Sequence, residues 1–310
     1  MQSADVRTGT LVGPADQQEI DEVDLVPVRT YWQLVRKRFL RHRLAVLALV
    51  VLAIMIVVST IVPLATGDAY KRSSIPLIND GPSLSAPLGY NQIGQNQFVR
   101  LMRASQTTLV IGFAAVFLIG IIGTVVGAIA GYFGGWIDNA LMRFVDIILS
   151  LPFLFLILII VSLFGFRDVR VVILAIGIVG WTTAARLVRA EFLAIRETDY
   201  ASAAKALGVN HQRLIIRHLL PGAMAPLVVA LALGVADAVI TESALSVLGF
   251  GIAPPEVSLG QMLNDFRENF FAHPERIWYP GIALIIIVLC ASFLGDGLRD
   301  ALDPRQKADG

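Results

Sequence analysis

SQTTLVIGFAAVFLIGIIGTVVGAIAG, residues 105–131, runs without a single charged side chain. The hydrocarbon core of a bilayer is about 30 Å thick, and an α-helix needs about 20 apolar residues to cross it. Gly123, Gly127 and Gly131 recur at four-residue spacing, which aligns them on one helix face and lets a neighbouring helix come close. The stretch therefore predicts a membrane-spanning helix that packs tightly against a second one.

Further apolar runs of similar length lie on both sides of this one. They cover residues 44–64, 137–164, 169–188, 221–249 and 277–298. Hydrophobic residues make up 56% of the chain and charged residues 16%, whereas soluble domains are about a quarter charged. We therefore expect an all-α fold, a polytopic membrane helical bundle of about six transmembrane helices in contact with the lipid bilayer. The net charge of +1 lacks the basic surplus that nucleic-acid binding requires, so that class of partner is excluded.

Lys and Arg gather in two segments that flank the predicted spans. One precedes the first span, and the other is residues 191–220, between the fourth and fifth spans. Basic flanks are typical of the cytoplasmic side, and an even number of spans places both termini on one side. We expect a multi-pass protein of the cytoplasmic membrane with both termini in the cytoplasm. Arg100 and Arg103 depart from this pattern, because they fall at the outer end of the second span.

The spans divide the chain into five parts. These are a cytoplasmic N-terminal tail at 1–43, a first transmembrane helix at 44–64, an extracytoplasmic loop at 65–104, a core domain at 105–298 and a cytoplasmic tail at 299–310. Within the first part, residues 30–43 form an amphipathic basic segment. That segment either lies at the membrane surface or extends the first span, and the sequence leaves both alternatives open.

Residues 191–220 are too polar to cross a bilayer, yet they show helical periodicity. Apolar side chains recur at helical spacing up to Leu207, and Gly208 is expected to end that helix as its C-cap. Asn210 is expected to cap a second short helix by accepting from its exposed N–H groups, and Pro221 to open the next span. The pattern predicts two short helices joined by a glycine turn. The alternative is a solvated linker helix in which alanine serves only helix propensity.

Several catalytic motifs are missing from the sequence. No Gly-rich phosphate-binding loop precedes a lysine, and neither HExxH nor GxSxG occurs. We interpret His211 and His218 as flanking the second short helix rather than binding a metal. The chain is therefore expected not to be an enzyme and to bind no metal or cofactor directly.

Several stretches resemble one family of membrane proteins. YASAAKALG at 200–208, followed by RHLLP at 217–221, resembles the EAA loop of ATP-binding-cassette (ABC) importer permeases. ESALSVLGFG at 242–251 and LGDGLRDALDPR at 294–305 resemble the C-type permease of dipeptide, oligopeptide and nickel importers. The likeness covers most of the chain from Thr30 onward, and it implies the ABC importer type I permease fold.

The resemblance also implies partners and a coupling site. The partners would be a second homologous permease subunit, two ABC ATPase subunits that use ATP and Mg²⁺, and an extracytoplasmic substrate-binding protein. The loop would dock on the ATPase and transmit its closure. The residues that it would use for this are Tyr200, Ala201, Ser202, Ala203, Ala204, Lys205, Leu207, Gly208, Val209, Asn210, Arg217, Leu220 and Pro221.

The chain departs from the family pattern at a few positions. Ser202 stands where the family commonly has Glu, and Leu259 replaces a customary Trp. Asn91, Gln95 and Asn96 stand where the family shows Asp, Arg and Asp. The changes on the outer face put the cargo or the receptor in question rather than the coupling to the ATPase.

Acidic residues inside the predicted spans are costly and often functional. Asp237 and Glu242, with Ser246, are candidates to line a water-filled path and to accept the amino end of a peptide. Alternatively, Glu242 pairs or caps inside the bundle. Asp146 is expected to pair with Arg143, three residues before it.

Other functions remain open at this point. A secondary transporter driven by an ion gradient would show internal repeats and interrupted helices, and a membrane-embedded enzyme would need convergent catalytic groups. We detect neither repeats nor such groups in the sequence, so peptide import by an ABC system is the interpretation we prefer. Dipeptide, oligopeptide, nickel and glutathione-like cargo all stay possible.

Overall fold

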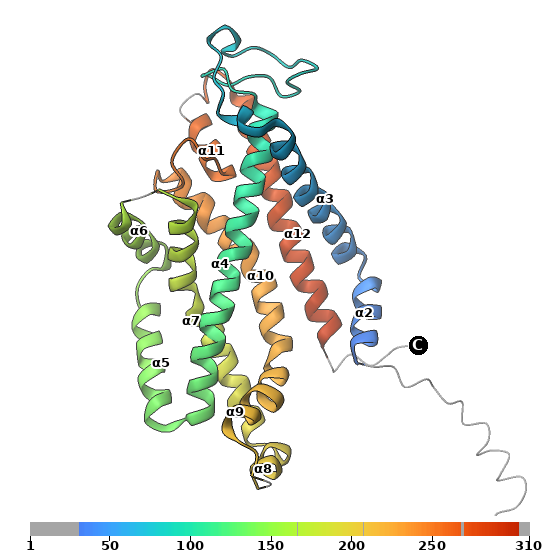
Figure 1. Cartoon of the computed structure of the whole chain (residues 1–310), viewed down its shortest axis with the longest axis vertical. Helices are drawn as coiled ribbons and strands as arrows, with labels where there is room; N and C mark the ends of the chain where they lie inside the picture. Colours follow the sequence, from blue (N-terminus) through green and yellow to red (C-terminus); the bar gives the residue numbers. More distant parts are fainter. Residues whose placement is uncertain (1–30, 166, 207, 268–269, 304–310) are drawn as a thin grey trace, which may run out of the picture.

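The computed structural model describes residues 31–303, except Phe166, Leu207, Glu268 and Asn269. Every regular element in this part of the chain is a helix, and one isolated bridge joins Tyr90 to Asn96. The predicted all-α helical bundle is confirmed (Figure 1).

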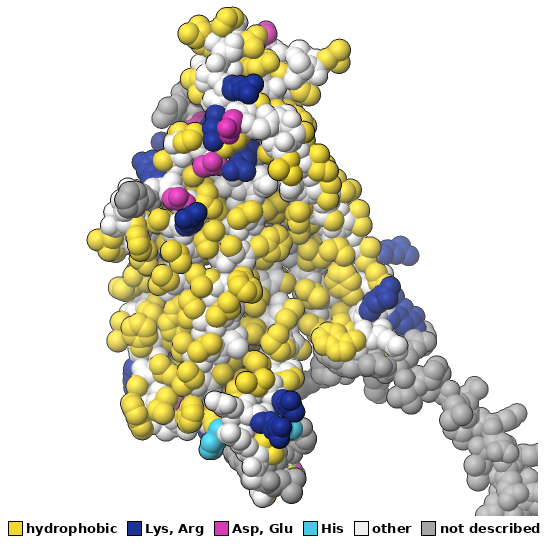
Figure 2. Space-filling view, in the orientation of Figure 1, with side chains coloured by type: hydrophobic (Ala, Val, Ile, Leu, Met, Phe, Trp, Pro, Cys, Tyr) yellow, Lys and Arg dark blue, Asp and Glu magenta, His cyan; other side chains and the backbone are white. Residues whose placement is uncertain are grey.

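The helices α3 (Arg43–Thr66), α4 (Gln97–Phe133), α7 (Val169–Arg196), α10 (Leu220–Val247) and α12 (Trp278–Leu302) make up the bundle. Each is long and apolar enough to cross a membrane. In Figure 2, hydrophobic side chains form a broad belt across the middle of the face shown, and charged side chains gather above and below it. Such a belt is expected of a protein whose sides contact the hydrocarbon core of a bilayer.

The third predicted span is not one straight helix. Residues 137–164 form α5 (Gly135–Leu149) and α6 (Phe153–Phe164), which are bent by 88° relative to one another. Pro152 lies in the break and has no N–H to continue the helical hydrogen bonds. The prediction of a continuous third helix was therefore wrong, and the pair is either a broken span or a re-entrant loop.

The glycine spacing in α4 produces the close helix contact that the sequence predicts. A Cβ added at Gly123 would lie 2.5 Å from the Ala184 Cβ, and one at Gly131 would lie 2.6 Å from the Phe192 Cβ. Both neighbours are on α7, so the small-residue face of α4 allows the two backbones to approach. The α4–α7 pair is the centre of the bundle, and α10 packs against it (Figure 1).

The two ends of the described chain lie together. Helix α2 (Tyr31–Arg41) is separated from α3 by His42, whose extended backbone and Nδ1 acceptor begin the new helix. Arg38 donates to the main-chain oxygen of Asp303 at 2.8 Å, and His42 Nε2 lies 3.5 Å from an Asp300 carboxylate oxygen. Within the described part of the predicted segment, α2 is thus a separate helix held against the end of α12 rather than a continuous extension of α3.

The opposite end of the bundle carries the long loops. The turns η1 (Gly67–Lys71) and η2 (Ile75–Leu77) lie in the loop before α4. Helix α11 (Leu259–Arg267) and the turn η4 (Pro274–Ile277) lie between α10 and α12. Figure 1 shows these elements grouped at the top, away from α8 and α9 at the bottom.

Candidate functional site

Residues 197–219 form a compact projection between α7 and α10, which we call the α8–α9 segment. Helix α8 (Asp199–Ala206) is followed by a turn, by the short helix α9 (His211–Leu214) and by a π-helical turn, η3 (Ile215–Leu219). In Figure 1 the segment lies beyond the ends of α4 and α7. A projecting pair of short helices is a surface on which another protein can dock.

Gly208 makes the turn between α8 and α9. Its φ is +76°, in the left-handed region that glycine adopts at little cost, and a Cβ built there would meet no atom within 4 Å. The turn predicted from the sequence is present. Asn210 occupies the N-cap position of α9 but makes no side-chain capping bond, so that part of the prediction was wrong. At its other end, α9 continues through η3 into α10 without a break.

The residues expected to couple to an ATPase differ in exposure. Ala201 is buried, and Val209 and Leu220 are half-buried. The exposed residues are Ala203, Gly208, Asn210, Arg217 and Pro221. Tyr200, Ser202, Ala204 and Lys205 lie on α8, but their side chains lie outside the described part, as does the whole of Leu207.

Side-chain contacts join the end of α4 to the α8–α9 segment and to the residue that precedes it. The Tyr132 hydroxyl hydrogen-bonds with Nδ1 of His211, the first residue of α9. Arg196, the last residue of α7, donates from Nη1 to the main-chain oxygens of Tyr132 at 3.1 Å and Gly131 at 3.4 Å. Carbonyls at a helix C-terminus lack intrahelical donors and carry partial negative charge, so the guanidinium stabilises this end of α4. Sequence reasoning missed these contacts, because they join residues more than 60 positions apart.

Asp237 lies in the middle third of α10, and its exposed side chain lines a cavity of about 420 Å³. The walls come from α4, α7, α10 and the bend between α5 and α6, and they are largely apolar. They include Val116, Ile119, Leu149, Phe153, Ile176, Leu231 and Ile240. Thr183, an exposed polar residue of α7, also lines the cavity.

Glu242 and Ser246 lie apart from this cavity and are completely buried. Ser246 Oγ donates to Glu242 Oε1 at 2.7 Å, whereas Glu242 Oε2 has no hydrogen-bond partner among the described residues. Of the two alternatives for Glu242, the arrangement favours a bond within the bundle over exposure to a path. The three residues predicted to line one path are thus divided. Asp237 lines the cavity, whereas Glu242 and Ser246 are buried inside the bundle.

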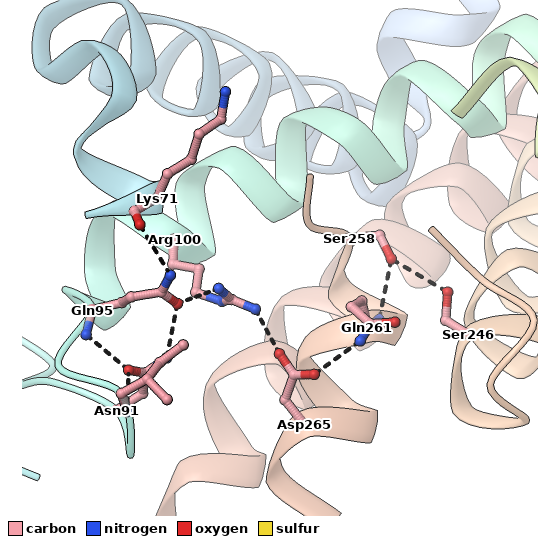
Figure 3. A network of polar contacts seen from close by, with 9 residues as sticks. Lys71, Asn91, Gln95, Arg100, Ser246, Ser258, Gln261 and Asp265 are labelled. Atoms are coloured by element: carbon pink, nitrogen blue, oxygen red, sulfur yellow. Dashed lines mark hydrogen bonds and ion pairs between the residues drawn. The ribbon is translucent and has the colours of Figure 1, made fainter. Parts of the chain in front are cut away.

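From Ser246, a chain of polar contacts runs through α11 to the first turn of α4 (Figure 3). Ser246 lies 3.4 Å from the Ser258 hydroxyl, which accepts from the Gln261 N–H at 3.1 Å. Gln261 then donates to Asp265 at 2.9 Å, and the other Asp265 oxygen accepts from Arg100 at 2.6 Å. The chain links α10 to α11 and α4.

Arg100 continues the network into the loop before α4. Its second amino group donates to the side-chain oxygen of Gln95, which also accepts from Asn91 at 3.1 Å (Figure 3). Asn91 and Gln95 are two of the amides that stand where the resembling family has an acid and an arginine. In this chain the two amides hydrogen-bond to each other, and the Gln95 oxygen also accepts from Arg100.

The exceptions to the charge pattern have local partners. Arg100 pairs with Asp265, and Arg103 pairs with Glu256 at 2.8 Å. Burial raises the pKa of Glu256, but hydrogen bonds from Arg103 and Tyr70 outweigh it and hold that pKa below its ordinary value. Both arginines are thus neutralised by acids at the end of the bundle that carries the long loops.

Acids near the opposite end of the bundle are also paired with arginines. Asp146 pairs with Arg186 at 2.5 Å, and Asp138 pairs with Arg189. The predicted pair of Asp146 with Arg143 was wrong, because a partner on α7 is closer than the neighbour on α5. Among the described residues, no group of three or more His, Cys, Asp or Glu side chains is placed to hold a metal ion.

Comparisons with known proteins agree with this arrangement. Residues 123–308 match the family described as binding-protein-dependent transport system inner membrane component. Residues 30–87 match the N-terminal TM domain of oligopeptide transport permease C.

Two curated relatives cover most of the chain. A dipeptide transport system permease protein from Alkalihalophilus pseudofirmus is 35% identical over 277 residues, which are 89% of this chain and 91% of that protein. A glutathione transport system permease protein from Pectobacterium atrosepticum is 35% identical over 282 residues, 91% and 93% of the two chains.

The likeness to solved structures is one of fold. The MetNI methionine ABC transporter in an inward facing conformation matches with a TM-score of 0.54 and 24% identity. The match covers 67% of this chain and 98% of that one.

Proposed function

The chain belongs to the binding-protein-dependent transport system inner membrane components, and from this premise we propose that it forms part of the pore of an ABC importer for small peptides. The support for a peptide cargo is that relatives over about nine tenths of the chain are named for dipeptide and glutathione transport. Both cargoes are short peptides with a free amino group. A glutathione-like cargo is the second candidate, because that relative is as similar as the first.

The α8–α9 segment is proposed as the contact with a separate ATPase subunit. The observation that carries this is its geometry, in which two short helices project past the bundle and are joined by an exposed glycine turn. The sequence has no phosphate-binding loop of its own, so ATP and Mg²⁺ would be bound by the partner. The full assembly would have two such ATPases, a second permease and an extracytoplasmic substrate-binding protein.

The proposal fixes the orientation of the chain. Helices α3, α4, α7, α10 and α12 run so that α2, the end of α12 and the α8–α9 segment share one end of the bundle. A segment that contacts a cytoplasmic ATPase must be cytoplasmic. Both termini would then be cytoplasmic as well, and the network around Arg100 would face the binding protein.

Closure of the two ATPases would displace the α8–α9 segment. The displacement would reach α10 directly through η3, and it would reach α4 through Arg196 and the Tyr132–His211 hydrogen bond. Helices α4 and α10 both line the cavity that holds Asp237. Movement of these two helices would change access to the cavity, as alternating access requires.

The test is co-purification of the ATPase subunits with Gly208→Trp. The bulky side chain would stand on the docking surface, so we expect loss of ATPase association with normal membrane insertion. Gly165→Trp is the matched control, because Gly165 also has a positive φ, +65°, and open space around it, but lies at the other end of the bundle. Normal recovery of the complex and normal transport with Gly208→Trp would refute the proposed contact.

A further inference from the structure

Asp237 differs from three other aspartates of the helices in having no arginine partner. Asp138, Asp146 and Asp265 each form an ion pair with an arginine of another helix. Among the described residues, no ion pair involves Asp237. Its carboxylate faces a cavity at membrane depth instead.

An unpaired carboxylate at this depth is costly. An acid at the centre of a transmembrane helix costs about 2.5 to 3.5 kcal/mol on insertion scales, unless water or a cation reaches it. The nearby hydroxyls do not relieve this cost. Thr241 Oγ1 donates to the main-chain oxygen of Asp237 at 2.7 Å, and Thr182 Oγ1 donates to the Val179 oxygen at 3.3 Å. The cavity therefore presents a negative group that lacks a positive partner.

The cavity combines this single charge with apolar walls that discriminate little between side chains of different shape. Its volume of about 420 Å³ falls in the range of small-ligand sites, about 300 to 1,000 Å³. Branched and aromatic side chains such as Ile119, Phe153 and Ile176 line it and offer apolar contact without fixed hydrogen-bond geometry. Such a site accepts side chains of varied shape and requires one positive charge.

We propose that Asp237 is a transient binding site for the primary ammonium group of the cargo during its passage through the cavity. This inference rests on the proposed import function, and it adds a chemical requirement within the membrane that the receptor alone would not impose. A charge-assisted hydrogen bond to the carboxylate would hold the amino end of a peptide. A single such bond is weak enough to release the cargo, as conduction requires.

The experiment uses protection of a cysteine from a thiol reagent. The chain has one cysteine, Cys290, which is buried on α12 and serves as the background. Thr183→Cys places a reactive thiol on the part of the cavity wall that α7 forms. The complete complex is reconstituted in lipid without the binding protein, and labelling rates are measured with alanyl-alanine or N-acetyl-alanyl-alanine present.

We expect saturating alanyl-alanine to slow labelling about tenfold, and the acetylated dipeptide to leave it unchanged. Adding Asp237→Asn removes the protection, whereas Asp237→Glu retains it. Asp68→Asn, which removes an acid outside the bundle, is the matched control and keeps full protection.

Equal protection by the two dipeptides, or protection that survives Asp237→Asn, would overturn the ammonium site. So would a Thr183→Cys thiol that stays unreactive in the assembled complex, since a side chain of the second permease would then fill the cavity. Assembly is measured first on the same preparation, and ATP-driven uptake is measured after the binding protein is added to it. A failure there refutes the import function, whereas a failure of protection in an active complex refutes this inference alone.

Discussion

Arg196 Nη1 donates to the main-chain oxygen of Tyr132 over 3.1 Å, which ties the last residue of α7 to the end of α4. Arg196 is followed at once by the α8–α9 segment, and α4 lines the cavity of Asp237. The bond therefore lies between the proposed docking surface and the proposed path. It can therefore transmit a displacement of the α8–α9 segment by a partner ATPase to α4.

Arg196→Ala is expected to uncouple transport without preventing assembly. The last carbonyls of α4 would lose a cationic donor worth about 1 kcal/mol, so the transport per ATP hydrolysed should fall about fivefold. Arg196→Lys should retain more of it, because the ammonium still donates to a carbonyl. Uptake and ATP hydrolysis in proteoliposomes give the ratio. An unchanged ratio in Arg196→Ala, matching that of the exposed Arg170→Ala, would contradict the link.

Gly127→Ala is expected to destabilise the bundle. The added Cβ would lie 2.5 Å from the Ala185 main-chain oxygen and 2.8 Å from the Val188 Cβ, so α4 and α7 must separate. Overpacking of this kind costs about 1 to 3 kcal/mol. Gly281→Ala has open space around its added Cβ and should be neutral or slightly stabilising. Thermal unfolding in detergent distinguishes the two, and equal midpoints would argue against a tight α4–α7 contact.

Arg100 and Asp265 are expected to be strongly coupled in a double-mutant cycle. The Arg100 side chain is 8% exposed, so Asp265→Asn would leave a buried charge unpaired at a cost of about 3 to 5 kcal/mol. The double variant Arg100→Gln with Asp265→Asn should lose much less than the sum of the single variants. The exposed pair Lys71 and Asp68 is the comparison, with coupling of about 0 to 1 kcal/mol. Additive unfolding midpoints for the first pair would show that the network adds nothing.

The Arg103–Glu256 pair is expected to lose its contribution in acid. The folded-state pKa of Glu256 is lowered, so its stabilisation is full above the ordinary value near 4.5 and disappears as pH falls through the lower folded value. Because the pair is partly exposed, the effect should be about 0.2 to 1 kcal/mol. Wild type should therefore unfold at a higher temperature than Glu256→Gln at pH 6, and the difference should shrink as the pH is lowered below 4.5. A difference that grew on acidification would reverse the sign and refute the assignment.

Local sequence signals predicted much of the helical bundle and the glycine turn. The apolar run at 105–131 lies within α4, and the spacing of Gly123, Gly127 and Gly131 predicted its close neighbour. Gly208 predicted the turn, because glycine adopts at little cost the positive φ with which a helix ends. These features depend on residues within one or two helical turns.

Other features depend on contacts that one-dimensional spacing does not contain. Helix α4 begins at Gln97, well before the apolar run, because Asn96 caps it and Asp265 neutralises Arg100 from 165 residues away. Asp146 pairs with Arg186 because α5 packs against α7, although Arg143 is closer to it in the sequence. Pro152 was inside an apolar run, so hydropathy alone gave no sign of the 88° bend.

The energy source of transport tests the central claim most directly. The chain is reconstituted in proteoliposomes with a second permease, two ATPases and a binding protein, and peptide uptake is measured with ATP or with an imposed ion gradient. We predict uptake that needs ATP, is lost with Gly208→Trp and survives collapse of every ion gradient. Peptide uptake by the purified chain alone, driven by an ion gradient, would contradict it.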